Sequence, residues 1–393
     1  MSAAPVPATR RLALLLGGLA MFGPFSIDTI FPAFPQIGAQ LGADPVAMQQ
    51  TISVYLLAYA GMSLLHGPLS DALGRRRVIL GGLLLFRALQ GLSAGVGLIV
   101  GRAVIRDVLH GDDAQRLMSQ VSMIFGIAPA VAPVLGGGLL GWTRWPAIFW
   151  FLALFALALL LATWRGLPET HLPAARLPLR PSALARSYLT IARSPRFWRL
   201  SAAALNFGAL FLYIASAPVF VLEHLRLGTQ QFGWFFIPMI AGMMLGAWVS
   251  GKTAGRVDGV RLANIGFALC GTAVAVNLAY KALVPVPTLP WAVLPMSLNA
   301  FGIALVFPII TLAILDMFPH QRGGASSLQA FAGLLVNALI AGVLSPLLSG
   351  TGLRLALGAA TFAAGAWMFW WWEMRSHALA VTATSAPLEQ IDV

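Results

Sequence analysis

The sequence predicts an all-α integral membrane protein whose helices cross the bilayer many times. Of its 393 residues, 59% are hydrophobic and only 10% are charged, and the mean hydropathy is +0.82. A soluble domain of this length cannot bury so much apolar surface, so lipid must solvate most of it. The apolar residues also fall in runs of about 20, the length of helix that crosses about 30 Å of hydrocarbon.

The apolar runs predict eleven full spans and one short stub at 78–86. The full spans lie near 12–34, 48–69, 88–108, 117–140, 145–166, 198–222, 231–250, 262–282, 289–312, 325–349 and 352–372. A polar interval rich in arginine and proline divides the chain into two halves. We therefore expect an N-terminal bundle (1–166), a solvated cytoplasmic linker (167–197), a C-terminal bundle (198–375) and a disordered cytoplasmic tail (376–393).

The positive charges predict the orientation of these spans. Twenty of the 25 Lys and Arg residues, including Arg102, fall on one side if 78–108 leaves one membrane face and returns to it. Four fall on the other side, and Arg87 lies within the membrane. Cytoplasmic loops carry an excess of Lys and Arg, so we expect both termini to lie in the cytoplasm. We expect the protein itself in the cell inner membrane. The charges cluster at span ends, which does not favour a nucleic-acid surface.

The first span contains an acid, Asp28, that has no basic neighbour in sequence. A charged side chain in hydrocarbon is costly and usually faces a cavity or a partner. The alternative is that Asp28 marks the outer end of a short span, but the apolar character continues through Phe34. Asp28 lies 17 residues beyond Arg11, about 25 Å along a helix. Arg87 precedes Arg102 by 15 residues, about 22 Å if Arg102 marks the cytoplasmic end. We predict that Asp28 and Arg87 pair and carry protons.

The stretch GPLSDALGRRR (67–77) predicts a conformational latch made of Gly67, Asp71, Gly74 and Arg75. Gly67 permits close approach of a neighbouring helix. Asp71 lies one helical turn from Arg75, so the two can pair. The Asp71 carboxylate is also suited to the positive N-terminus of another helix. The alternative is a generic loop that only sets topology.

This stretch closely resembles the loop signature of the major facilitator superfamily, and SGKTAGRVDGVR (250–261) resembles a degenerate second copy. SIDTIFPAFP (26–35) resembles the first span of the Bcr/CflA-type drug-efflux subfamily. RALQGLSAG (87–95) with GRAVIRD (101–107) resembles its fourth span. The resemblance implies a two-bundle fold of twelve spans and a proton-coupled antiporter that exports small, chemically varied molecules.

GIAPAVAPVLGG (126–137) resembles the fifth-span signature of antiporters. Its candidate residues are Pro129, Pro133, Gly136 and Gly137. The prolines free backbone carbonyls and kink the helix. The glycines allow close packing that suits a seal on the outer side, although ordinary helix packing would use them equally well.

The segment from Val78 to Val108 departs from the family pattern because it has only 31 residues. Two crossings need about 40 residues and a turn. Loss of one whole crossing would invert every later loop, which the charge distribution opposes. We therefore predict a truncated third helix. This shortening leaves open whether the chain transports.

Several polar or amphipathic residues inside the spans are candidates for a substrate cavity, although each could instead bond to a neighbouring helix. They are Tyr55, Asn206, Tyr213, Trp234, Asn299, Gln329 and Asn337. The six histidines show no metal-ligand spacing, and no GxxxxGK[ST] loop is present. We expect no enzyme activity and no cofactor, and as partners a small molecule, protons and lipid around a monomer. A dedicated metabolite exporter and a transport-inactive membrane protein remain alternatives.

Overall fold

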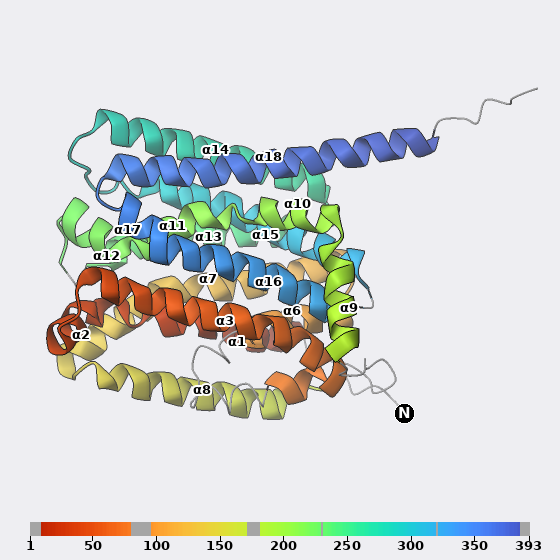
Figure 1. Ribbon diagram of the computed structural model, residues 1–393, viewed down its shortest axis with the longest axis horizontal. Helices are drawn as coiled ribbons and strands as arrows, with labels where there is room; N and C mark the ends of the chain where they lie inside the picture. The colour runs from red at the N-terminus through yellow and green to blue at the C-terminus, as the bar shows by residue number, and fades with distance from the viewer. Residues whose placement is uncertain (1–8, 80–95, 171–180, 229–230, 320, 386–393) are drawn as a thin grey trace, which may run out of the picture.

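The computed structural model describes residues 9–79, 96–170, 181–228, 231–319 and 321–385, and all regular elements in these ranges are helices. Most helices lie side by side along the longest axis of the molecule (Figure 1). The described N-terminal half contains α1 (Thr9–Asp28), η1 (Phe31–Ala33), α2 (Phe34–Leu41), α3 (Pro45–Leu73), α6 (Val96–Val108), α7 (Gly111–Trp142) and α8 (Pro146–Gly166).

The C-terminal half repeats this pattern of long apolar helices. It contains α10 (Pro195–Ala204), α11 (Phe207–Ala215), α12 (Ala217–Val219), η3 (Phe220–His224), α13 (Gly233–Thr253), α14 (Gly259–Leu283), α15 (Leu294–Met317), α16 (Arg322–Leu339), η4 (Ile340–Leu344), α17 (Ser345–Leu348) and α18 (Gly352–Ser385). The interval between the halves contains α9 (Pro181–Ala192).

Nine helices in the described ranges are long and apolar enough to cross a membrane. The pair α10 and α11, bent by 46°, would make a tenth. Their length follows from the thickness of the hydrocarbon layer, as the apolar runs predict. The predicted all-α, multi-pass membrane fold is thus confirmed.

The interval between the halves is not simply a solvated linker, because α9 packs across the ends of the bundles (Figure 1). The Tyr188 hydroxyl of α9 donates to the carbonyl of Leu64, and Ser187 Oγ lies 3.0 Å from Gln321 Oε1. We call this end of the molecule the linker end. The start of α1 and the end of α18 lie there too (Figure 1). The described α18 continues to Ser385, past the predicted end of the C-terminal bundle at residue 375.

The two halves meet along α3 with α16 and along α7 with α13. At the linker end, Arg106 Nε of α6 donates to Asp316 Oδ1 of α15 at 2.7 Å. At the opposite end, Gln50 Nε2 of α3 donates to the carbonyl of Gly342 at 3.0 Å. Contacts between the halves are therefore present at both ends of the space between them.

The shortened segment 78–108 begins and ends at the linker end, because Arg75 Nε donates to Asp107 Oδ2 at 2.9 Å. This geometry agrees with a chain that leaves one face and returns to it. The predicted truncation falls mainly on residues 80–95, which lie outside the described residues, and so stays a prediction.

Candidate functional site

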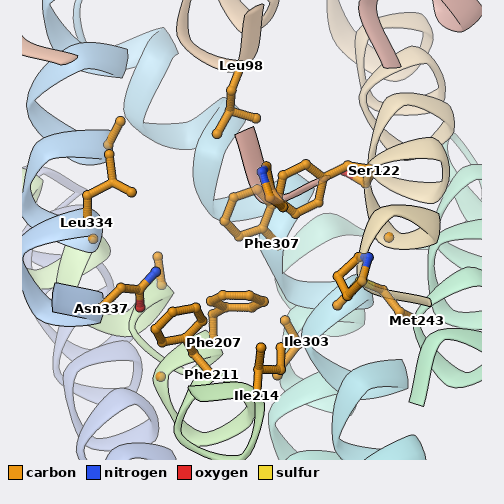
Figure 2. A pocket seen from close by; sticks show the side chains of 18 of the residues that line it. Leu98, Ser122, Phe207, Phe211, Ile214, Met243, Ile303, Phe307, Leu334 and Asn337 are labelled. Atoms are coloured by element: carbon orange, nitrogen blue, oxygen red, sulfur yellow. The ribbon is translucent and has the colours of Figure 1, made fainter. Parts of the chain in front are cut away.

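A cavity of about 210 Å³ lies between the two halves. Helices α1, α3, α6 and α7 line it from the N-terminal half, and α10, α11, α13, α15 and α16 line it from the C-terminal half. Most of its wall is apolar, and Figure 2 shows aromatic and aliphatic side chains that face the space: Phe207, Phe211, Ile214, Met243, Ile303, Phe307 and Leu334. Such a wall suits apolar ligands, with a few polar groups to orient them.

Asp28 is the last residue of α1, and its side chain lines the cavity with 4% of the residue exposed. The hydroxyl groups next to Asp28 bond to the backbone of the preceding turn. Ser26 Oγ donates to the carbonyl of Phe22 (2.8 Å), and Thr29 Oγ1 donates to the carbonyl of Phe25 (2.6 Å). Among the described residues, the Asp28 carboxyl makes no hydrogen bond or ion pair, and Tyr55 lies within electrostatic range. The acid thus faces the cavity, as predicted from its cost in lipid.

Arg102 of α6 also lines the cavity, with 7% of the residue exposed. Its guanidinium carbon lies 4.9 Å from the ring centre of Phe307, a cation–π contact between the two halves. Placing Arg102 at the cytoplasmic end of its helix was wrong, because α6 continues to Val108, about 9 Å further along the helix axis. One indication of this in the sequence is that Arg102 lies six residues before the end of the predicted span 88–108.

Asp28 and Arg102 lie at opposite ends of the cavity. Gly101 packs near Leu16 and Gly97 packs closely on Leu19, so α6 runs antiparallel to α1, with Gly101 level with Leu16. Asp28 is twelve residues beyond Leu16, which places it about 18 Å further along the helix axis. The two charges are thus too far apart for a direct ion pair.

Arg87, the predicted partner of Asp28, lies outside the described residues. Its predicted height of about 22 Å was measured from Arg102 as a helix end. Arg102 lies inside the membrane-spanning part of α6, so the reference point of that estimate was wrong, and the position of Arg87 stays a prediction. Among the residues that the structure describes, the acid and base that line this cavity are Asp28 and Arg102.

The structure brings the predicted latch residues together at the linker end. Arg75 pairs with Asp71 through Nη1 and with Asp107 through Nε. The backbone N–H of Arg75 donates to Glu169 Oε1 at 2.8 Å. Gly74 ends α3 with a φ of 102°, a conformation that favours glycine. The turn therefore directs Arg75 back onto its own helix.

The same cluster docks on α16. A side chain on Gly323 in the first turn of α16 would collide with the Asp71 carboxylate, which lies directly against that turn. The backbone N–H of Gly67 donates to Ser327 Oγ at 2.9 Å, and a side chain on Gly67 would collide with the carbonyl of Gly323. Asp71 thus meets both partners considered from the sequence, an arginine one turn away and a helix N-terminus.

The predicted fifth-span residues lie in α7, which packs along α1. Pro129 lines the cavity, and Pro133 lies one turn further within the same continuous helix. Gly136 packs against the carbonyl of Thr29, immediately after Asp28, and Gly137 lies beside Pro32. These glycines therefore allow α7 to approach the chain where α1 ends.

Of the seven polar residues proposed to line a cavity, Gln329 and Asn337 do so (Figure 2 shows Asn337). Tyr55 does not line it, but its hydroxyl donates to the carbonyl of Gly23 at 3.3 Å, close to Asp28. Placing Trp234 in the cavity was wrong, because 61% of the residue is exposed on the outer surface. An amphipathic tryptophan at a helix start is typical of the membrane–water interface.

The other three polar candidates bond inside the C-terminal half instead. Asn206 Nδ2 donates to Cys270 Sγ at 3.1 Å, and Asn277 Nδ2 donates to Tyr213 Oη at 2.8 Å. Cys270 also lies 3.5 Å from the carbonyl of Asn299. The Asn206 amide and the Tyr213 hydroxyl thus hold helices together, the alternative considered for polar residues in spans, whereas Asn299 takes part through its backbone carbonyl.

Two membrane bundles around a central cavity with buried charged groups form the architecture of a secondary transporter. The family model of the Major Facilitator Superfamily matches residues 14–86 and 82–341, so the chain belongs to this family and is a transporter, not an enzyme. The two matches meet inside the segment in which the sequence predicts missing residues.

The resemblance to drug-efflux members of the family is also confirmed. The chain is 26% identical over 351 residues to a bicyclomycin resistance protein homolog of Haemophilus influenzae, covering 83% of this chain and 87% of that protein. It is 27% identical over 351 residues to a chloramphenicol resistance protein of Pseudomonas aeruginosa, covering 83% and 82%. The solved structure of the proton:xylose symporter XylE superposes with a TM-score of 0.74 at 12% identity, covering 92% of this chain and 95% of that chain, and shows the fold alone.

Proposed function

We propose that this chain is a proton-coupled antiporter that exports small, chemically varied drugs across the cell inner membrane, with both termini in the cytoplasm. The observation that carries the proposal is the Asp28 carboxyl, buried in the wall of an apolar cavity between the halves. An intramembrane acid is a default candidate for proton transfer. The names of the relatives, which concern resistance to bicyclomycin and chloramphenicol, support export of drugs.

Drug and proton movements are coupled because Asp28, the proposed proton-carrying group, lines the same cavity that holds the drug. When the opposite end opens, Asp28 is reached from outside and takes up a proton there, and drug leaves. When the linker end opens, the carboxyl releases its proton to the cytoplasm as a drug enters. Competition between drug and proton for the same cavity then links their opposite movements.

The two closed ends are the parts that must open in turn. Opening the linker end separates Gly67 from Ser327 and moves Asp71 away from the start of α16. Opening the opposite end breaks the bond between Gln50 and Gly342. In this proposal the Asp71–Arg75–Asp107 cluster stabilises closure of the linker end, as the latch prediction expects.

The test is drug accumulation in cells that express the chain, with and without a proton uncoupler, followed by exchange in proteoliposomes with an imposed pH gradient. Asp28→Asn removes the proton-carrying group at nearly constant size, so we expect it to insert normally but to lose pH-driven exchange. Asp113→Asn is the matched control, because the Asp113 side chain is exposed at the start of α7. Retained pH-driven exchange in Asp28→Asn would refute the assignment.

A transport-inactive protein is the second candidate. It is favoured by the 31 residues available for two crossings between Arg77 and Leu109, and by the family match in two pieces. If no drug moves in proteoliposomes whose protein is inserted and folded, this candidate replaces the first. The apolar cavity wall gives little support to a dedicated exporter of a polar metabolite.

A further inference from the structure

The end of the cavity that contains Arg102 carries a positive charge without a neighbouring acid. Among the cavity-lining residues that the structure describes, Asp28 is the one acid, and it lies about 18 Å away along the helix axis. Among the described residues Arg102 has no carboxylate partner, and its guanidinium lies over the Phe307 ring. Tyr59 of α3 lies within electrostatic range, but a neutral phenol supplies no counter-charge. A buried charge of this kind needs a partner, so its guanidinium N–H groups remain available for a ligand.

Two further polar side chains lie near this end. Ser326 Oγ of α16 donates to the carbonyl of Ile99 at 3.4 Å, which places Gln329, one turn later on α16, beside α6. Gln329 lines the cavity, and its side-chain amide Nε2 is a hydrogen-bond donor. Ser122 of α7 lines it too (Figure 2), two residues before Ile124, which packs on Gly17. These three side chains come from both halves and supply guanidinium, amide and hydroxyl donors.

We propose that Arg102, with Gln329 and Ser122, forms a subsite that binds an anionic or strongly hydrogen-bond-accepting group of the exported molecule. This inference rests on the proposed function, and it names the substrate class: amphiphilic molecules with an aromatic or aliphatic body and an acceptor group at one end. The apolar body lies against Phe207, Phe211 and their neighbours, and the acceptor group points to the linker end. The acceptor group binds away from Asp28, while the body of the drug occupies the cavity that Asp28 also lines, as the proposed competition with the proton requires.

The separation of the two charges explains why one cavity serves both tasks. An anion beside Asp28 would be repelled by the ionised carboxylate, whereas Arg102 holds an anion at the other end of the cavity, on a residue whose backbone lies about 18 Å from that of Asp28 along the helix axis. The guanidinium fork binds carboxylate, sulfonate, nitro or carbonyl oxygens with two parallel N–H donors. Arg102 is thus a specificity residue, and the apolar wall accepts varied bodies.

The test uses two fluorescent probes that differ in one group: anilinonaphthalene sulfonate and phenylnaphthylamine, which has the same body without the sulfonate. Each is titrated onto the full chain in lipid nanodiscs, without a pH gradient, and binding to empty nanodiscs is subtracted. We expect Arg102→Gln to weaken binding of the sulfonate about tenfold or more and binding of the neutral probe by about twofold at most. Arg102→Lys, which keeps the charge but not the fork, should fall between.

Arg116→Gln is the charge-matched control, because Arg116 pairs with Asp113 at the surface end of α7. It should leave both affinities unchanged. If Arg102→Gln weakens binding of both probes equally, Arg102 acts only by contact with Phe307, and the subsite is refuted. If it leaves both affinities unchanged, the subsite is refuted as well. Because the titration measures equilibrium binding, its outcome does not depend on proton coupling, which Asp28→Asn tests separately.

Discussion

Gly67 is the position at which a single methyl group should open the linker end. A side chain there would collide with the carbonyl of Gly323 and with Ser327 Oγ, so α3 and α16 must move apart. Overpacking of this kind costs about 1–3 kcal/mol. The bond from the Gly67 N–H to Ser327 Oγ, 2.9 Å long, contributes about 1 kcal/mol more. A total of about 3 kcal/mol changes the ratio of closed to open linker ends by about 100-fold, since each 1.4 kcal/mol is a factor of ten.

Opening of the linker end is measured as an increase in the distance between the two halves at that end. Spin labels on Leu73→Cys, at the end of α3, and Pro319→Cys, just after α15, occupy exposed positions. The single native cysteine, Cys270, is buried, so it does not compete for the label. In the Gly67→Ala background we expect a longer and broader distance distribution in double electron–electron resonance.

Gly61→Ala is the control in the same helix, because a side chain at Gly61 meets nothing within 4 Å. It should leave the distance distribution as in the unmodified chain. If Gly67→Ala also leaves the distribution unchanged, the contact with α16 does not hold the linker end closed, and the reasoning fails.

Two further predictions concern the C-terminal half. Glu373 of α18 is 1% exposed and accepts from Arg196 (2.7 Å) and Arg199 (2.8 Å) of α10, so Glu373→Ala should lower the free energy of unfolding by about 1.5–3 kcal/mol. Thermal unfolding in detergent measures this, and an unchanged Tm would show that the pair adds nothing. Trp234→Ala should leave drug affinity within about twofold because Trp234 faces outward. A loss of drug affinity of tenfold or more would show that Trp234 does line the cavity.

The spans were predictable because hydrocarbon thickness sets the length of each apolar run. The predicted run 145–166 corresponds to α8 (Pro146–Gly166), and the run 262–282 lies within α14 (Gly259–Leu283). Interactions within one helical turn were predictable too, as for Asp71 and Arg75. Both depend on residues that are close in sequence.

The lining of the cavity was less predictable. A span in lipid is apolar on every side, so its sequence has no amphipathic pattern that marks the inward face. Asn206 and Trp234 both looked suitable for the cavity, yet one bonds to Cys270 and the other faces outward. Arg102 was missed because an arginine near a span end has the same appearance whether it sets topology or lines a cavity.

By itself, the sequence determined that this is a membrane protein of two helical halves, how long its spans are, and that Asp28 must avoid lipid, because transfer free energies act on each residue wherever it packs. Only the tertiary structure decided that Arg102 faces the same cavity from its far end, and that Gly67 and Asp71 meet the start of α16. Those contacts join residues that are distant in the chain. They depend on how each helix is rotated about its axis, and packing between helices sets that rotation.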